Sequence, residues 1–265
     1  MVTFDSANVT KLSSIINDLL KNMFSIFKKE LQSFFSNATG YIVVGIFLIL
    51  SALFLWVIPG EYNVLDNGYA NVDGLFYLAP WLFLFLCPAI TMRLLAEEKQ
   101  LGTWELIITK PISKFHIVLA KFFAAWLLVL ISLLPTLIYY FSVIYLAEPV
   151  GNVDSGAFWG SFIGLVLLAA GYVAIGLFAS SVSSNQLVSF VLALVFSFFF
   201  YYGFDVLVGF ISSGFSMQFI ENLGIHAHYK SISRGVIDLG DIIYFFGLCA
   251  SFLTATVYRI RTKNA

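Results

Sequence analysis

Charged residues are scarce in this chain, and so are cysteines. Only 11% of its 265 residues are charged and 60% are hydrophobic, whereas about one quarter of a soluble domain is charged. This composition excludes an ordinary soluble enzyme and a disordered chain. Cys87 and Cys249 both lie in apolar runs, so we expect neither a disulfide framework nor a metal site from them. The net charge of −1 provides no basic surface for nucleic acid.

The chain also lacks the motifs of common catalytic and nucleotide-binding sites. No G-x-x-x-x-G-K-[ST] motif occurs, so the chain has no P-loop for a nucleotide, and no Ser-His-Asp signature is present. His226 and His228 stand two residues apart without an evident third ligand, which favours a surface pair over a metal site. We therefore expect no catalytic residue, no metal and no bound cofactor on this chain.

Long apolar runs dominate the sequence. A helix of about 20 residues crosses a hydrocarbon core of about 30 Å. Six runs have about this length, and they lack the period-two alternation of a barrel strand. The sequence therefore predicts an all-α polytopic membrane protein with six transmembrane helices. The predicted spans are Tyr41–Ile58, Leu75–Leu95, Ile117–Tyr140, Phe158–Val182, Leu187–Phe210 and Asp241–Ile260.

The residues before the first span divide into two parts. Residues 1–22 carry charges and no long apolar core, which predicts a loosely ordered cytosolic extension rather than a signal peptide. Residues 23–36 place apolar side chains on one helical face and Lys28 and Lys29 on the other. This pattern predicts an interfacial amphipathic helix, with a soluble helix packed on a partner as the alternative. Residues 37–265 then form the six-span domain.

Basic residues are distributed unevenly between the two sides of the predicted spans. Twelve of the 14 precede span one, lie in or beside the segment that joins spans two and three, or lie at or after the end of span six. Only Lys230 and Arg234 fall on the other side. The positive-inside rule then places both termini in the cytoplasm. The segment 211–239 is external in this orientation, and its apolar residues predict short helices dipping into the membrane or an ordinary loop.

Two features of the spans bear on function and shape. Ionisable residues inside spans are few, which disfavours a stand-alone secondary transporter. Asp205 is the intramembrane polar candidate, and an interfacial cap is a better interpretation than a proton carrier. Lys121, at the start of span three, can extend its charge toward the interface. The third apolar run continues to Leu146, and Pro135 predicts a kink within it.

The polar stretch 96–114 between spans two and three is the main candidate site. Gly102 should break the helix of span two, and Thr103 can cap a short second helix, with Glu105 in its positive first turn. Pro111 stops that helix, and Ser113 can cap the next one. The candidate residues of this loop are Glu97, Glu98, Gly102, Thr103, Trp104, Glu105, Leu106, Thr109 and Pro111.

The apolar residues of this loop indicate a protein partner, because a solvated loop needs none. We expect Trp104, with Leu106 and Ile107, to be the buried anchor of that contact. The alternative is that Trp104 lies at the inner lipid interface. Glu97, Glu98 and Glu105 either complement charges on the partner or maintain the shape of the loop itself.

Residues 97–113, EEKQLGTWELIITKPIS, resemble the signature loop of ABC-2 type transporter permeases. The blocks FLWVIPGEYN at 54–63 and SISRGVID at 231–238 are similar to the gliding-motility-associated permease subunits of Bacteroidota. The resemblance extends from Met23 to the C-terminus. It implies an ABC-2 (type V exporter-like) permease fold in the bacterial inner membrane.

The resemblance also implies partners. The loop 96–114 would be a coupling helix that docks on a separate ABC ATP-binding subunit, which uses ATP and Mg. A second permease-like subunit (GldG-like) or a second copy of the chain would complete the complex in the membrane lipid. Either a permease or a non-transporting anchor of a motility machine needs this coupling loop. Small residues on span four allow close helix packing, either with such a second unit or only within the chain. They are Gly160, Gly164, Ala169, Ala170 and Gly171.

Overall fold

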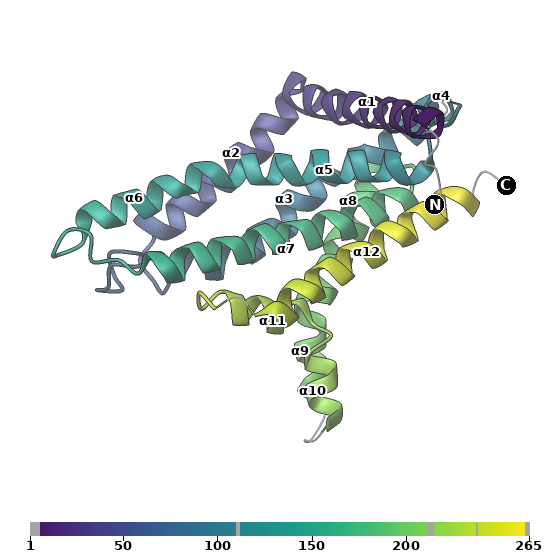
Figure 1. Ribbon diagram of the computed structural model, residues 1–265. Helices are drawn as coiled ribbons and strands as arrows, with labels where there is room; N and C mark the ends of the chain where they lie inside the picture. Colours follow the sequence, from purple (N-terminus) through teal and green to yellow (C-terminus); the bar gives the residue numbers. More distant parts are fainter. Residues whose placement is uncertain (1–5, 110–111, 211–214, 237, 263–265) are drawn as a thin grey trace.

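The computed structural model describes residues 6–109, 112–210, 215–236 and 238–262, and the regular elements in these ranges are all helices (Figure 1). Six helices are long and apolar enough to cross a membrane, each within a few residues of its predicted bounds. The predicted fold class, an all-α polytopic membrane protein, is therefore confirmed. The six spans are Ala38–Val57, Asp73–Gln100, Lys114–Leu146, Ser155–Val182, Gln186–Val208 and Leu239–Thr262.

Three of the spans change helix type along their length. Span three changes to a 3₁₀ turn at Leu134–Thr136, where Pro135 lacks the backbone donor that an α-helix needs, as expected. Spans one and five each contain a π-helical turn. In chain order the span elements are α2 (Ala38–Ala52), η1 (Leu53–Val57), α3 (Asp73–Gln100), α5 (Lys114–Leu133), η2 (Leu134–Thr136), α6 (Leu137–Leu146), α7 (Ser155–Val182), α8 (Gln186–Phe198), η3 (Phe199–Gly203), α9 (Phe204–Val208) and α12 (Leu239–Thr262).

One helix, α1, covers Ser6–Ser36 without a break. The predicted amphipathic helix over 23–36 is therefore the last part of a longer helix that begins at Ser6. Helix α1 packs along α5, and Figure 1 shows it lying above the bundle. The chain leaves α1 at Asn37, whose extended backbone separates α1 from the first span.

Helix α7 lies at the centre of the bundle and packs against α3, α8 and α12. The small residues of α7 pack against other parts of the same chain. The sequence had left this open, with contact to a second permease unit as the other interpretation. A Cβ atom on Gly160 would lie 2.5 Å from the carbonyl oxygen of Gly235, and one on Gly164 would lie 2.8 Å from Ile232 Cγ2. Ala169, Ala170 and Gly171 are buried as well.

The segment between spans five and six contains two short helices, α10 (Phe215–Glu221) and α11 (Ile225–Ile232). Figure 1 shows α9 and α10 extending away from the other helices, whereas α11 returns to the bundle. Ile225 and Ile232 are fully buried, and the Tyr229 hydroxyl donates a hydrogen bond to the Phe76 carbonyl at 2.7 Å. Helix α11 therefore packs against the end of the bundle opposite α4 (Thr103–Ile108), called the far end below.

Helix α7 lies so close to the turn after α11 that a methyl group added at their contact should reduce the stability of the protein. Gly160→Ala places its Cβ against the backbone of Gly235, so we expect a loss of about 1–3 kcal/mol from overpacking. Gly45→Ala in α2 is the matched control, because a Cβ there meets nothing within 4 Å. Thermal unfolding of the detergent-purified variants measures the difference. Equal melting temperatures for the two variants would contradict this packing.

Candidate partner-docking site around α4

Helix α4 is a six-residue helix, Thr103–Ile108, that connects spans two and three. As expected, Gly102 breaks the preceding helix: its φ of +71° lies in the left-handed region, which glycine adopts without a steric penalty. The expectation that Thr103 caps α4 is wrong. The chain turns one residue earlier, so Gly102 holds the cap position, and the Thr103 hydroxyl donates back to the Glu98 carbonyl at 3.4 Å.

The rest of the loop follows the local signals of its sequence. Glu105 lies in the first turn of α4, where a negative charge is favourable. Thr109 follows the last residue of α4 and is exposed. The Ser113 side chain caps α5 by accepting from the backbone amide of His116 at 3.4 Å. Pro111, the expected stop signal, lies outside the described residues.

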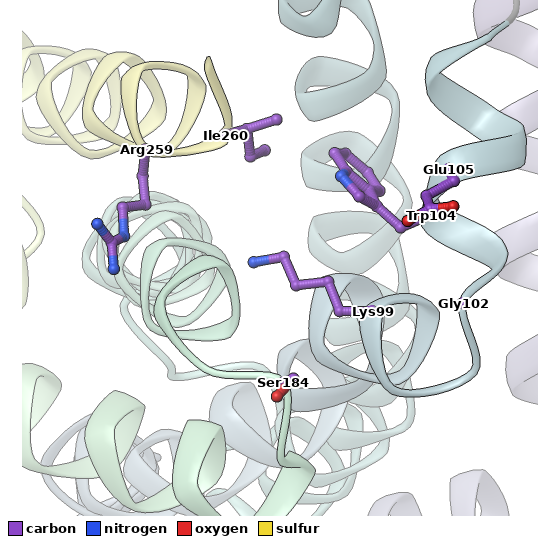
Figure 2. Close-up of a pocket in the computed structure, with 7 residues that line it drawn as sticks. All are labelled: Lys99, Gly102, Trp104, Glu105, Ser184, Arg259 and Ile260. Atoms are coloured by element: carbon purple, nitrogen blue, oxygen red, sulfur yellow. The ribbon is translucent and has the colours of Figure 1, made fainter. Parts of the chain in front are cut away.

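Trp104 points into the protein. Only 6% of it is exposed, and it borders a cavity of about 360 Å³ between α4, the end of α3 and the end of α12. Figure 2 shows Trp104, Lys99 and Ile260 directed toward the space between α4 and α12. The expectation that Trp104 is the centre of a partner contact is therefore not supported. Its ring is covered by its own chain and anchors α4 to the bundle.

The outward face of α4 has a different composition. Leu106 is 68% exposed, Glu105 is exposed, and Leu101 just before the helix is 68% exposed. Ile107 is partly buried and packs against the core. The exposed surface at α4 is thus formed by Leu101 and Leu106, with Glu105 at the rim of the cavity that Trp104 also lines.

Glu98 belongs to a buried charge network at the base of α4. Lys121 of α5 is fully buried, and its Nζ lies 2.6 Å from Glu30 Oε1 and 2.9 Å from Glu98 Oε2. The same Nζ donates to the Leu94 carbonyl at 2.7 Å. Lys29 of α1 completes the network, with its Nζ 2.7 Å from Glu98 Oε1. Four charges therefore tie α1, α3 and α5 together beside the loop that contains α4.

The network bears on the roles of the three glutamates and corrects one expectation. Glu98 maintains the shape of the protein itself, whereas Glu97 is partly buried and Glu105 is exposed. Lys121 does not extend to the interface, because two carboxylates and a carbonyl hold its ammonium inside the chain. Burial alone lowers the pKa of Lys29, but its hydrogen bond and charge interactions with Glu98, together with Glu30, outweigh burial and raise the pKa above 10.5.

Asp205 and the two histidines are joined at the far end of the bundle. Asp205, in the first turn of α9, forms a pair with His226 Nδ1 of α11. His228 Nδ1 lies 2.7 Å from Asp241 Oδ1 of α12. Each histidine is therefore paired with a carboxylate rather than with the other histidine. Within the described residues there is no group of three side chains that could hold a metal ion.

Six membrane-length helices within the described residues define a multi-pass membrane protein. A family model described as ABC-2 family transporter protein matches residues 58–225, which include α3, α4 and α5 and more than half of the chain. The chain therefore belongs to the ABC-2 transporter family, whose members are membrane permease subunits of ABC transporters. No curated protein matches the chain.

The buried network predicts that Lys121 is more important for stability than other lysines near α1. Lys121→Met removes the cation between Glu30 and Glu98, whose side chains are only 10% and 9% exposed, so we expect a loss of about 3–5 kcal/mol. Lys28→Met is the control, because Lys28 is exposed. Thermal unfolding in detergent measures both changes. A Lys121→Met protein as stable as Lys28→Met would contradict the structural role of the network.

Proposed function

We propose that this chain is a permease subunit whose helix α4 docks on a separate ATP-binding subunit. The single observation that carries the proposal is the arrangement of α4. Its inward side is fixed by buried Trp104, while Leu106 stands 68% exposed on its outward side. An exposed apolar side chain on a rigidly anchored short helix is suited to a protein contact.

Coupling follows from what α4 is attached to. Its two ends continue into α3 and α5, so a push on α4 reaches spans two and three directly. The Lys121 network then links these spans to α1. ATP and Mg would be used by the partner, and this chain would contribute the docking surface and the moving helices. A non-transporting anchor of an ATP-driven machine would use the same contact.

The orientation of the chain is part of the proposal. The beginning of α1, helix α4 and the end of α12 lie at the same end of the molecule in Figure 1. Twelve of the 14 basic residues precede span one, lie in or beside the α4 ends of spans two and three, or lie at or after the end of span six. The positive-inside rule therefore supports cytoplasmic termini and a cytoplasmic α4 in the bacterial inner membrane.

The sequence blocks at 54–63 and 231–238 support a narrower assignment. We propose a GldF-like subunit of a gliding-motility complex, paired with a GldG-like second permease subunit or with a second copy. The small residues of α7 are occupied within the chain, so a second permease must pack elsewhere. Spans one and five are the candidates, because only 22% of the apolar stretch of each span is buried inside the chain.

The docking surface predicts different effects for two neighbouring residues. Leu106→Ala should weaken capture of the ATP-binding subunit by about 2 kcal/mol if Leu106 is a hot spot, without loss of stability. Trp104→Ala should reduce stability as well as capture, because the ring is buried in its own chain. The measurement is recovery of the ATP-binding subunit by pull-down at equal membrane levels, with thermal unfolding in parallel.

Leu65→Ala is the matched control for Leu106→Ala, because Leu65 is 64% exposed in the loop between spans one and two at the far end. It should capture the partner as well as the wild type. If the Leu106→Ala protein recovers as much ATP-binding subunit as the Leu65→Ala protein, Leu106 is not part of the docking surface.

The proposed orientation predicts the response of topology reporters. A reporter active only outside the cytoplasm should be silent when fused at residue 1 or 265 and active at Asn71 or Asn152. The physical reason is the cost of moving clustered lysines and arginines across the membrane. Activity at either terminus would contradict the orientation, whatever the role of α4.

A further inference from the structure

A second cavity, of about 420 Å³, lies at the far end of the bundle. It is lined by residues of α3, η3, α11 and the loop between spans one and two. This volume is within the range of small-molecule sites. Nothing in the coupling mechanism uses this cavity.

The walls of the cavity are aromatic rings. The Trp81 ring lies 5.6 Å from that of Tyr201 at an interplanar angle of 81°, and 5.9 Å from that of Tyr202 at 55°. Tyr201 and Tyr202 are adjacent in sequence, yet both line the cavity. The π-helical turn η3 contains both residues, and such turns are frequent at functional sites.

The surroundings hold these rings in place. Tyr229 of α11 also lines the cavity, and its hydroxyl is fixed by the hydrogen bond to the Phe76 carbonyl. Burial raises the pKa of Tyr229 well above 10, so the hydroxyl stays neutral. His226, whose ring contacts the ring of Tyr201 at 5.3 Å, is paired with Asp205. The cavity is thus built from side chains with fixed partners.

Two exposed charges of opposite sign line the same cavity, Glu61 and Lys230. Within the described parts of the chain, neither side chain forms an ion pair or hydrogen bond. Aromatic faces beside a carboxylate attract an ammonium group, and a lysine attracts a phosphate. A ligand that carries both kinds of charge can interact with both of these residues at once.

We propose that this cavity binds a zwitterionic head group that carries an ammonium and a phosphate. The ammonium lies against Trp81 and Tyr202 beside Glu61, and the phosphate pairs with Lys230. The inference goes beyond the proposed function. Only the assignment of the cavity to one leaflet of the membrane rests on the orientation given above. That orientation places the cavity at the outer leaflet, where the head group of a phospholipid is at hand. Free phosphoethanolamine has the same chemistry.

The test is calorimetric titration of the full-length chain in detergent with three ligands. Dihexanoyl phosphatidylethanolamine should bind at least tenfold more tightly than dihexanoyl phosphatidylglycerol, which carries no ammonium. Phosphoethanolamine without acyl chains should bind more weakly if the ligand is a lipid, and equally well if it is the free head group. Both of these results support the site. Equal binding of the two lipids would overturn the proposal.

Variants assign the two charges. Glu61→Gln should reduce phosphatidylethanolamine binding about tenfold and abolish its preference over phosphatidylglycerol. Lys230→Gln should weaken the binding of both lipids. Glu148→Gln, in another loop at the far end and not lining this cavity, should bind like the wild type. Wild-type affinity in both Glu61→Gln and Lys230→Gln would overturn the proposal. None of these measurements involves the ATP-binding subunit. Failure of the head-group proposal therefore leaves the docking of α4 untouched, and failure of the docking proposal leaves the head-group site untouched.

Discussion

The buried ammonium of Lys121 is the constraint on which the α4 end of the protein depends. A charge removed from water must be paired and hydrogen-bonded, and Lys121 obtains both from Glu30, Glu98 and the Leu94 carbonyl. These partners come from α1 and α3. One requirement therefore fixes the positions of three helices, and Glu98 lies only five residues before α4 begins.

Helix α3 connects the two ends of the molecule. It carries Glu98 in the charge network, Thr91 against Gly176 of the central helix α7, and Trp81 in the aromatic cavity. A Cβ on Gly176 would lie 2.2 Å from Thr91 Oγ1, so the Thr91 side chain of α3 packs directly on the backbone of α7. A movement imposed on α4 thus acts on a helix that also forms a wall of the far-end cavity.

The spans, the break at Gly102 and the cap at Ser113 could be predicted because apolar length and local backbone preferences decide them. The charge network could not. Lys29 lies 69 residues from Glu98, and Glu30 lies 91 residues from Lys121, so their pairing is set by tertiary packing. The direction of Trp104 was also open, because a tryptophan on a short helix can face its own bundle or a partner. The start of α1 at Ser6, well before the predicted amphipathic segment 23–36, was not predicted either.

The most direct test of the account is site-specific photo-crosslinking in native membranes. A photoreactive amino acid is placed at position 106 in one strain and at position 104 in another. Position 106 faces outward and 104 faces the bundle, so the account predicts a cross-link to an ATP-binding subunit from 106 and none from 104. A partner cross-link from 104 with none from 106 would contradict the assigned docking face of α4.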